Sequence, residues 1–543
     1  MCKTNPNRFC GAFAALWLAT NAALAAEPSA SPAPVVGPLS AIEWLSHSVK
    51  LPLVRPTRTT SDLPAQALPE IADIEPGQGS VETTRLDESK VSVVGLLSPE
   101  VTGLPADLWG SMPSQMPGNE SLPALLYRAQ EASLPALRGL YLTLLLAEAP
   151  APLAHISDVD LFAERLDRLI DIGGLDQADA LLKIAAGGQS PLSDPPSIFQ
   201  RRLEVALLLD TPDDSCAALR ARPLLSPDLA ARIYCLGRAG DWRAAALALQ
   251  VGSALGQLPE ETEALLRRYL DPDLFEGADP LPPPQIPTAL GWRLLEGAGE
   301  PISSTLLPVR FAAADLGETT GWKARIEAAE RLVREGVLAP NILLGLYDER
   351  APAASGGVWE RVRAVQAFER ALALGVNDTI AQTLPEAWQQ MSAADLGVAF
   401  ANLYGQILAK QNLVGPSGDL AFRIGLLSGA FDQIARNHRP RTVQQQLLAA
   451  LALGTPLPDV ALGGQTEAIV YGMTKAAPPA DLVALQQSGQ TGQAILQAII
   501  LTDTGSWGAY PSLSEGLAML RALGLERIAR RCALELMLLE RRI

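Results

Sequence analysis

The stretch Gly240-Asp-Trp242-Arg-Ala-Ala245 joins two segments, 229–238 and 242–255, in which apolar residues recur at helical spacing. A glycine that follows a helix can adopt the left-handed conformation that ends it. The large side chain of Trp242 can then pack under the turn, and the small Ala245 lets the preceding helix come close. This stretch therefore predicts two antiparallel helices joined by a tight turn.

The same kind of turn recurs along the chain. Gly173-Gly-Leu175-Asp-Gln-Ala178 follows the helical pattern 161–172. Gly429-Ala-Phe431-Asp-Gln-Ile434 keeps the spacing, and a weaker copy begins at Gly489. Amphipathic segments separated by short Gly, Pro or Asp turns continue from about residue 121 onward, and strand-like alternation is almost absent. The body of the protein is therefore expected to be all-α and built from helical hairpins.

These turns resemble the turn inside tetratricopeptide repeats, in which an alanine holds the place of Ala178 and Ala245. The sequence departs from that family at the glycine of the preceding helix, which is replaced by Leu166 and Ile233, and the turns are unevenly spaced. The resemblance implies an α-solenoid, in which each helix pair contacts its neighbours and the stack exposes a concave surface.

The helical region is expected in two halves. A Pro-rich break at 271–287 separates 119–270 from 288–543. A chain of 543 residues has room for three or four globular domains, or for one elongated repeat region whose length no single core limits. The recurring turns favour the elongated repeat region.

The N-terminus has the features of an export signal. Lys3 and Arg8 precede an apolar run that ends at Ala23-Leu24-Ala25, where small residues allow cleavage. The run of about 16 residues is shorter than the ~20 that an uncleaved membrane anchor needs. We therefore predict a signal peptide at 1–25 and a periplasmic protein, with secretion as the alternative. No transmembrane segment is expected in the mature chain.

Residues 26–118 are rich in proline and small residues, which is typical of an extended linker. Two apolar segments, 39–49 and 91–109, interrupt this linker. Such segments either dock onto a partner or fold back onto their own protein. The residues expected to make these contacts are Leu39, Ile42, Trp44, Leu45, Leu108 and Trp109.

The charge of the chain constrains its partners. The formal net charge is −16, and removal of the signal peptide would make it more negative. An acidic protein repels the phosphates of nucleic acids and anionic lipid surfaces. We therefore expect a protein or peptide partner with a basic segment, and no nucleic acid. The sequence does not indicate the oligomeric state.

We identify no constellation of residues that would support catalysis. The three histidines, His47, His155 and His438, each lack a second ligand at metal-binding spacing. The sequence contains no serine-hydrolase elbow and no phosphate-binding or dinucleotide-binding loop. We therefore expect no enzyme activity, no metal and no cofactor.

Cysteines provide one structural prediction. Cys216 and Cys235 lie in segments on either side of a Pro-containing turn, and an antiparallel hairpin would bring their Cα atoms within the ~5.5 Å of a disulfide. A loop of about 20 residues would gain about 3 kcal/mol from the bond. The alternative is two separate buried thiols. Cys532 is expected to be buried in the last helix, outside any disulfide.

Two functional hypotheses remain. The first is an exported, non-enzymatic α-solenoid scaffold that binds a protein or peptide in the cell envelope. The second is a superhelical protein of peptidoglycan metabolism, because periplasmic lytic transglycosylases also carry long α-superhelices. Since the expected helices continue to the end of the chain, a regulator is preferred over an enzyme in this second hypothesis.

Overall fold

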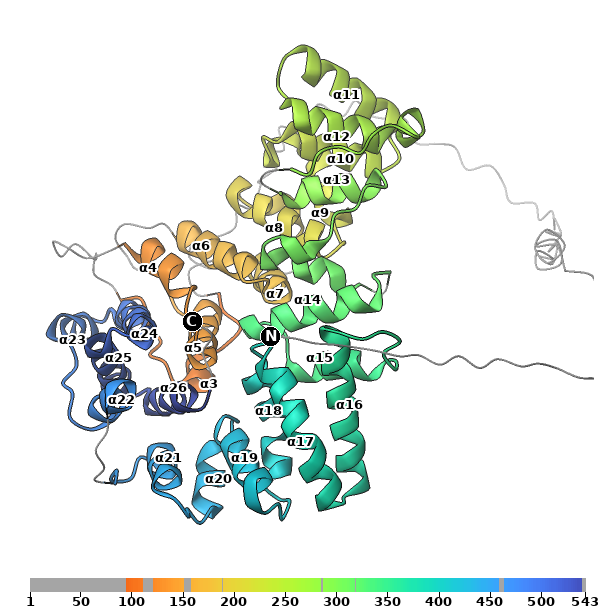
Figure 1. Cartoon of the computed structure of the whole chain (residues 1–543). Helices are drawn as coiled ribbons and strands as arrows, with labels where there is room; N and C mark the ends of the chain where they lie inside the picture. The colour runs from red at the N-terminus through yellow and green to blue at the C-terminus, as the bar shows by residue number, and fades with distance from the viewer. Residues whose placement is uncertain are drawn as a thin grey trace, which may run out of the picture. The chain divides into compact units, whose positions relative to one another are not determined.

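The computed structural model describes residues 94–110, 121–150, 158–187, 189–284, 287–317, 319–458 and 463–539 (Figure 1). The chain divides into two units, Met1–Ser80 and Val81–Ile543, and every described residue belongs to the second. Within the described residues the long elements are all helices, which confirms the all-α prediction. The predicted signal peptide and the apolar segment 39–49, with Leu39, Ile42, Trp44 and Leu45, lie outside the described residues.

The first half of the described region consists of α-helices joined by short 3-10 helices, which are labelled η. Their bounds are α3 Pro99–Thr102, α4 Leu122–Ala129, α5 Pro135–Leu146, α6 Asp158–Asp171, α7 Leu175–Ala186, η1 Pro191–Ser193, α8 Pro196–Leu208, α9 Asp213–Ala221, η2 Pro223–Leu225, α10 Leu229–Arg238, α11 Trp242–Ala254, α12 Glu260–Leu270 and η3 Pro272–Phe275.

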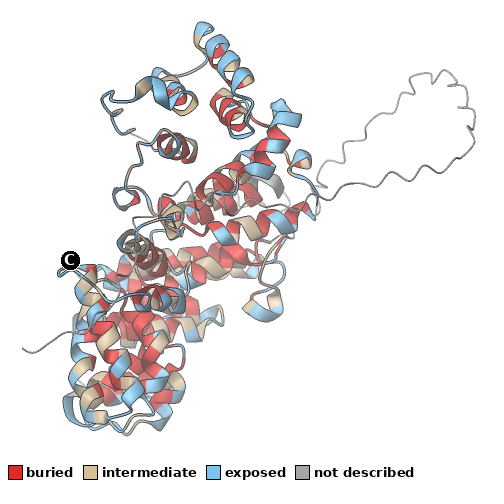
Figure 2. Ribbon diagram, turned by 90° about the vertical axis from the view of Figure 1, so that its right-hand side faces the viewer, coloured by how far each residue is buried: buried red, intermediate tan, exposed pale blue. Residues whose placement is uncertain are grey.

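The second half continues in the same way. Its elements are α13 Ala289–Gly297, η4 Ser304–Leu306, η5 Val309–Leu316, α14 Trp322–Glu335, α15 Pro340–Asp348, α16 Val358–Leu374, α17 Asn377–Ser392, α18 Gly397–Leu408, α19 Gly415–Leu426, α20 Phe431–Asn437, α21 Val443–Leu453, α22 Gly464–Thr474, α23 Ala480–Gln487, α24 Thr491–Ser506, α25 Tyr510–Ala522 and α26 Glu526–Leu538. Buried residues lie on the helix faces that meet other helices, and exposed residues lie on the opposite faces (Figure 2).

The predicted turns join helices that pack against each other, α6 with α7, α10 with α11, and α23 with α24. Gly173, Gly240 and Gly489 have φ angles of 79°, 81° and 81°, so these three glycines are left-handed as predicted. Ala178 and Ala245 are fully buried at the helix crossings.

The prediction is wrong for the conformation of Gly429, which is not among the left-handed residues. Its N–H donates to the Asn402 side chain at 3.1 Å, so a contact from α18 shapes this turn instead. Phe431 is nevertheless buried behind it. Trp242 also departs from the prediction, because it is 49% exposed and only its edge rests on the turn, near Gly237.

The Pro-rich stretch 271–287 is not a boundary between two separate helical regions. Helices α12 and α13, on either side of it, pack directly against each other. The carboxylate of Glu300 pairs with Arg268 of α12 and accepts the Leu281 N–H at 2.9 Å. Glu300, which follows α13 in the chain, therefore connects Leu281 of this stretch to α12.

Helices from the two ends of the described region contact each other. Helices α4 and α5 pack against α24, and α5 also packs against α26 (orange and blue in Figure 1). The Ser133 N–H donates to Asp503 at 2.7 Å, and the Ala136 N–H donates to Glu535 at 2.9 Å. A solenoid with contacts only between sequential neighbours would not contain these bonds.

A buried arginine fixes the first described residues. The Arg165 guanidinium donates to the carbonyl oxygens of Leu145 and Val94 at 2.8 Å and to that of Ala147 at 3.0 Å. A parallel β-bridge pairs Leu97 with Ala147 beside it. Residues 94–110 are therefore part of the folded unit, although they fall within the stretch 26–118 that the sequence predicts to be a linker.

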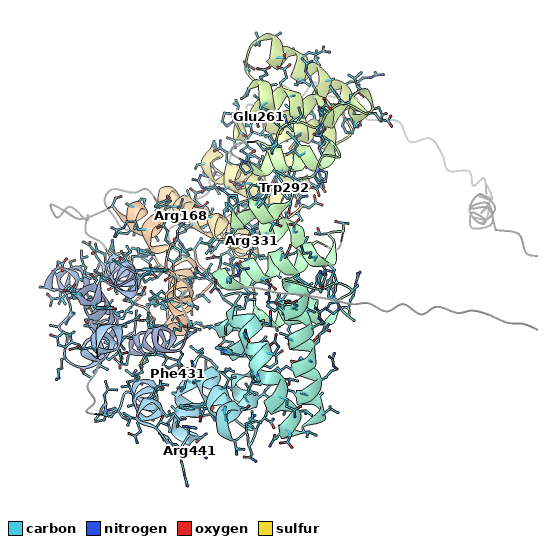
Figure 3. All side chains as sticks on the ribbon, viewed as in Figure 1. Arg168, Glu261, Trp292, Arg331, Phe431 and Arg441 are labelled. Carbon is cyan, nitrogen blue, oxygen red and sulfur yellow. A yellow bond between two sulfur atoms is a disulfide. The ribbon has the colours of Figure 1, made fainter. Side chains whose placement is uncertain are left out.

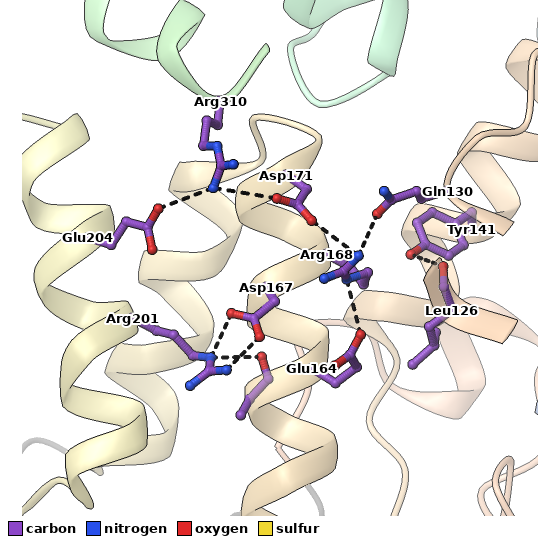
Figure 4. Close-up of polar contacts among 11 residues, drawn as sticks. Leu126, Gln130, Tyr141, Glu164, Asp167, Arg168, Asp171, Arg201, Glu204 and Arg310 are labelled. Carbon is purple, nitrogen blue, oxygen red and sulfur yellow. Dashed lines mark hydrogen bonds and ion pairs between the residues drawn. The ribbon is translucent and has the colours of Figure 1, made fainter. Parts of the chain in front are cut away.

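A network of charged side chains joins α6 to α8 and η5 (Figure 4). Its members are Glu164, Asp167, Arg168, Asp171, Arg201, Glu204 and Arg310. Arg310 bridges α6 and α8, since it lies 3.6 Å from Asp171 and 3.4 Å from Glu204. Burial raises the pKa of Glu164, Asp171 and Glu204, because the hydration that the ionised carboxylates lose outweighs their attraction to the nearby arginines.

This network predicts a specific pH dependence of stability. Burial raises the pKa of Glu204; Asp167 and Asp171 add to that rise, while Arg310 and Arg201 oppose it. A carboxyl with a raised folded-state pKa contributes stability below its unfolded pKa and loses it as pH rises through the folded value. We expect Glu204→Gln to be more stable than wild type at neutral pH, with the difference vanishing toward about pH 4. Urea unfolding of both proteins between neutral pH and about pH 4 measures this difference in the free energy of unfolding.

Asp213 provides the control, because its effect on stability changes with pH in the opposite direction. A hydrogen bond from Arg238, 2.7 Å long, lowers the pKa of the exposed Asp213. Its stabilising contribution is present at neutral pH and is lost as pH falls through the lowered pKa. Asp213→Asn should therefore lose stability at neutral pH and approach wild type in acid. A Glu204→Gln variant whose stability parallels wild type at every pH would contradict the prediction.

Candidate functional site

Helix α11 has a large apolar face that no described residue covers. Leu247, Val251 and the C-cap residue Leu255 are 62%, 50% and 65% exposed, and their four-residue spacing places them along one side of the helix and its C-terminal end. Ala245, Leu249 and Gly252 form the buried side. Four-residue spacing of exposed large side chains on a 13-residue helix is typical of an interaction surface rather than of scattered apolar residues.

The buried side fixes α11 against its neighbours. A Cβ atom added at Gly252 would lie 2.4 Å from Leu229 Cδ2, so α11 approaches the start of α10 closely at this glycine. The Asp241 carboxylate accepts the Ala244 N–H at 3.1 Å and caps the helix. The ring of Tyr269, at the end of α12, lies between Tyr234 and Trp242, with centroid distances of 5.3 and 6.2 Å. The exposed face therefore lies on a rigid support.

The surface around α11 is strongly acidic. Residues 241–279 are all described, and their exposed carboxylates are Asp241, Glu260, Glu261, Asp271, Asp273, Glu276 and Asp279. The exposed arginines of the same stretch are Arg243 and Arg267, and Arg267 is paired with Glu263.

The carboxylates flank both ends of α11. Helix α12 runs antiparallel to α11, because Tyr269 at its end lies beside Trp242 at the start of α11. Asp271 and Asp273 therefore lie toward the N-terminal end of the apolar face. Glu260 and Glu261 begin α12 next to the C-terminal end (Glu261 is labelled in Figure 3). The arrangement is an apolar stripe with an excess of carboxylates at each end, and the exposed Arg243, four residues before Leu247, is the cation at its N-terminal end.

The other predicted contact residues do not lie on this surface. Leu108 and Trp109 are fully buried in the protein's own body. The Leu108 carbonyl accepts the Gly492 N–H at 2.7 Å, and a Cβ atom at Gly492 would lie 2.5 Å from the Trp109 ring. Of the two alternatives for the segment 91–109, the structure therefore has the fold-back, so these two side chains do not dock onto a partner here.

A disulfide joins Cys216 of α9 to Cys235 of α10, with a Cα–Cα distance of 4.9 Å. Cys532 is fully buried in α26 and is not part of it. Because α10 supports α11, the bond also braces the helix that carries the exposed face.

Removal of this disulfide is expected to lower the free energy of unfolding by about 3 kcal/mol, because the bond restricts the unfolded chain. The change is Cys216→Ala combined with Cys235→Ala, and denaturant unfolding without reductant measures it. Reducing the wild type should reproduce the loss, whereas the double variant should not respond to reductant. A wild type whose unfolding midpoint is unchanged by reductant would contradict this prediction.

The described residues contain no group of three or more His, Cys, Asp or Glu side chains that could hold a metal ion. His47 and His155 lie outside the described residues, and His438 follows α20. None of the helices in the described ranges is long and apolar enough to cross a membrane.

Sequence reasoning missed the α11 face although its signal is visible. Helix α11 has apolar residues on two sides, Ala245 and Leu249 on one and Leu247 and Val251 on the other. A helix with two apolar sides is either enclosed by the protein or presents one side to something else. The sequence does not show which, because that depends on the number of helices that surround α11.

Comparison of the chain with protein-family models, with curated proteins and with solved structures gives no match. The candidate site therefore rests on its own geometry: a rigid apolar helix face between acidic flanks.

Proposed function

We propose that this protein is an exported helical scaffold of the cell envelope that binds another protein through the exposed face of α11. The observation that carries the proposal is the uncovered stripe of Leu247, Val251 and Leu255 on a rigidly supported helix. Hairpin turns of the kind found at Gly173 and Gly240 support an arrangement of repeated helix pairs, in which α4 and α5 also contact α24 and α26.

The chemistry of the surface defines the partner segment. An apolar helix face is complementary to an amphipathic helix whose large side chains recur at positions i and i+4. Acidic side chains at both ends favour Lys or Arg at the ends of that helix. The proposed partner is therefore a protein with a basic amphipathic helix, which agrees in sign with the net charge of −16.

The test uses two designed peptides of about 16 residues, long enough to form a helix when bound. Both have leucine at i and i+4 spacing; one carries lysine at the remaining positions and the other glutamate. Fluorescence anisotropy should show binding of the lysine peptide, and the glutamate peptide should bind at least about tenfold more weakly, a difference of about 1.4 kcal/mol. Equal binding of the two peptides would contradict the proposal.

A variant pair assigns the binding to α11. Val251→Asp places a charge in the stripe and should weaken binding of the lysine peptide at least about tenfold. The control is Leu374→Asp at the end of α16, where the leucine is also exposed but lies outside this surface. If the two variants weaken binding equally, the peptide does not bind through α11.

Export is part of the proposal and has its own test. The Cys216–Cys235 disulfide supports it, because such bonds persist in oxidising compartments. Residues 1–25 fused to alkaline phosphatase, which is active only when exported and oxidised, should give activity in a bacterial host. Deletion of 1–25 from the fusion should abolish that activity, and activity that persists after the deletion would contradict this part of the proposal.

A further inference from the structure

A pocket of about 450 Å³ opens between the end of α18, helices α19 and α20, and the loop before α21. Its apolar lining includes Leu408, Ala421, Phe422 and Ile434. A volume in this range suits a small molecule rather than a protein surface. The pocket shares no residue with α11, so a ligand bound in it would be independent of the proposed function.

An aromatic pair forms one wall of the pocket. The rings of Phe422 and His438 stack with a centroid distance of 3.6 Å and an interplanar angle of 12°. Phe422 is buried and covers one face of the imidazole, while His438 is partly exposed and lines the pocket. Both residues line the pocket, so the pair offers an aromatic contact to a ligand.

The side chain of Gln445, which is buried at the start of α21, holds this wall in place. Its Nε2 donates to Asp419 Oδ1 at 2.9 Å, which leaves its Oε1 as an acceptor. That oxygen accepts the Arg441 N–H at 2.8 Å and lies 3.5 Å from His438 Nε2. Because Gln445 connects α19 to the loop, the ring of His438 and the backbone of Arg441 have fixed positions.

Three cationic side chains also line the pocket: Lys410, Arg439 and Arg441. Among the described residues, none of the three has a side-chain hydrogen bond or an ion pair (Arg441 is labelled in Figure 3). The carboxylate in the lining, Asp419, accepts a hydrogen bond from Gln445. Positive charge thus exceeds negative charge here, although the whole chain carries −16.

We propose that this pocket binds a small aromatic carboxylate. The ring of the ligand stacks on His438, its apolar edge contacts Leu408 and Ile434, and its carboxylate pairs with Arg439 and Arg441. Arginine matches a carboxylate through two parallel hydrogen bonds, and an aromatic ring matches the aromatic contact that the pair offers.

The test compares three probes by isothermal titration calorimetry on the full chain. The probe 2-naphthoate has both the ring and the charge, cyclohexanecarboxylate has the charge without the aromatic ring, and 2-naphthamide has the ring without the charge. The expected result is a Kd for 2-naphthoate at least about tenfold below that of each other probe. Similar affinity for all three, or displacement of 2-naphthoate by equimolar inorganic phosphate, would overturn the proposal.

Variants assign the binding to this pocket. Arg439→Gln combined with Arg441→Gln should raise the Kd of 2-naphthoate at least about tenfold. The matched control is Arg436→Gln on α20, whose arginine is paired with Asp432 and does not line the pocket. His438→Gln should remove the preference for 2-naphthoate over cyclohexanecarboxylate, and thermal unfolding should show that each variant is folded. Unchanged affinity in a folded double variant would also overturn the proposal.

Discussion

Replacing Arg165 with methionine is expected to lower the free energy of unfolding by about 3–5 kcal/mol. Arg165 is fully buried and donates to three carbonyl oxygens, those of Val94, Leu145 and Ala147. Burial lowers the pKa of Arg165 to about 10, so the guanidinium stays charged at neutral pH and its lost hydration offsets part of what the three hydrogen bonds contribute. Methionine fills similar space but leaves three buried acceptors without a donor, and each of these costs about 1–3 kcal/mol.

The effect of this change should also be local. Arg165 holds Val94 beside the β-bridge of Leu97 and Ala147, so its loss should release the first described segment. Urea unfolding measures the loss of global stability. The N–H groups of Leu96 and Leu97 donate to the Leu146 carbonyl, so faster hydrogen exchange at these two amides measures the release of this segment. Arg165→Lys is the control, because it keeps the charge but donates from one nitrogen, whereas the guanidinium reaches the three carbonyls from three separate nitrogens. A methionine variant as stable as wild type would contradict the prediction.

Replacing Glu330 with alanine is expected to cost a similar amount, about 3–5 kcal/mol, because the change leaves a largely buried cation without its partner. Glu330 of α14 is only 2% exposed. Its carboxylate accepts two hydrogen bonds from Arg361 of α16, at 2.7 and 2.5 Å, and one from the Tyr347 hydroxyl of α15, at 2.7 Å. One side chain thus joins three consecutive helices.

Two further variants distinguish the loss of the buried charge pair from the loss of a hydrogen bond alone. Tyr347→Phe removes one of the three hydrogen bonds and leaves the charge pair, so it should cost about 1 kcal/mol. Glu330→Gln keeps the shape but not the charge and should fall between the two. Urea unfolding at neutral pH ranks the three variants. The interpretation of Glu330 as a buried charge pair fails if Glu330→Ala costs no more than Tyr347→Phe.

The two ends of the described region could not be placed together from the sequence. The Ser133–Asp503 bond joins residues that are 370 positions apart, and no local pattern signals such a contact. The same holds for Trp109 and Gly492, where a tryptophan that looked like a docking residue is buried by a distant glycine. An apolar segment in a Pro-rich stretch has the same sequence whether it is buried by its own chain or by a partner.

In the candidate site, too, some features were predictable from the sequence and others only from the fold. Helix α10 has the predicted bounds and α11 nearly so, and Cys216 and Cys235 form the bond that their spacing suggested. The exposure of Leu247 and Val251 was not predictable, because it depends on which helices reach α11. Similarly, His438 looked like an isolated histidine until the fold placed Phe422 against it and Arg439 and Arg441 around the same pocket.

The sequence by itself determined the helical class, the hairpin turns at Gly173 and Gly240, and the pairing of the two cysteines. Each of these depends on residues within about one hairpin, where helical periodicity and the left-handed preference of glycine act. Only the tertiary structure decided that residues 94–110 are buried, that α11 is uncovered and that a cationic pocket forms beside His438. Burial is a property of the neighbours that folding brings together, and those neighbours are distant in the chain.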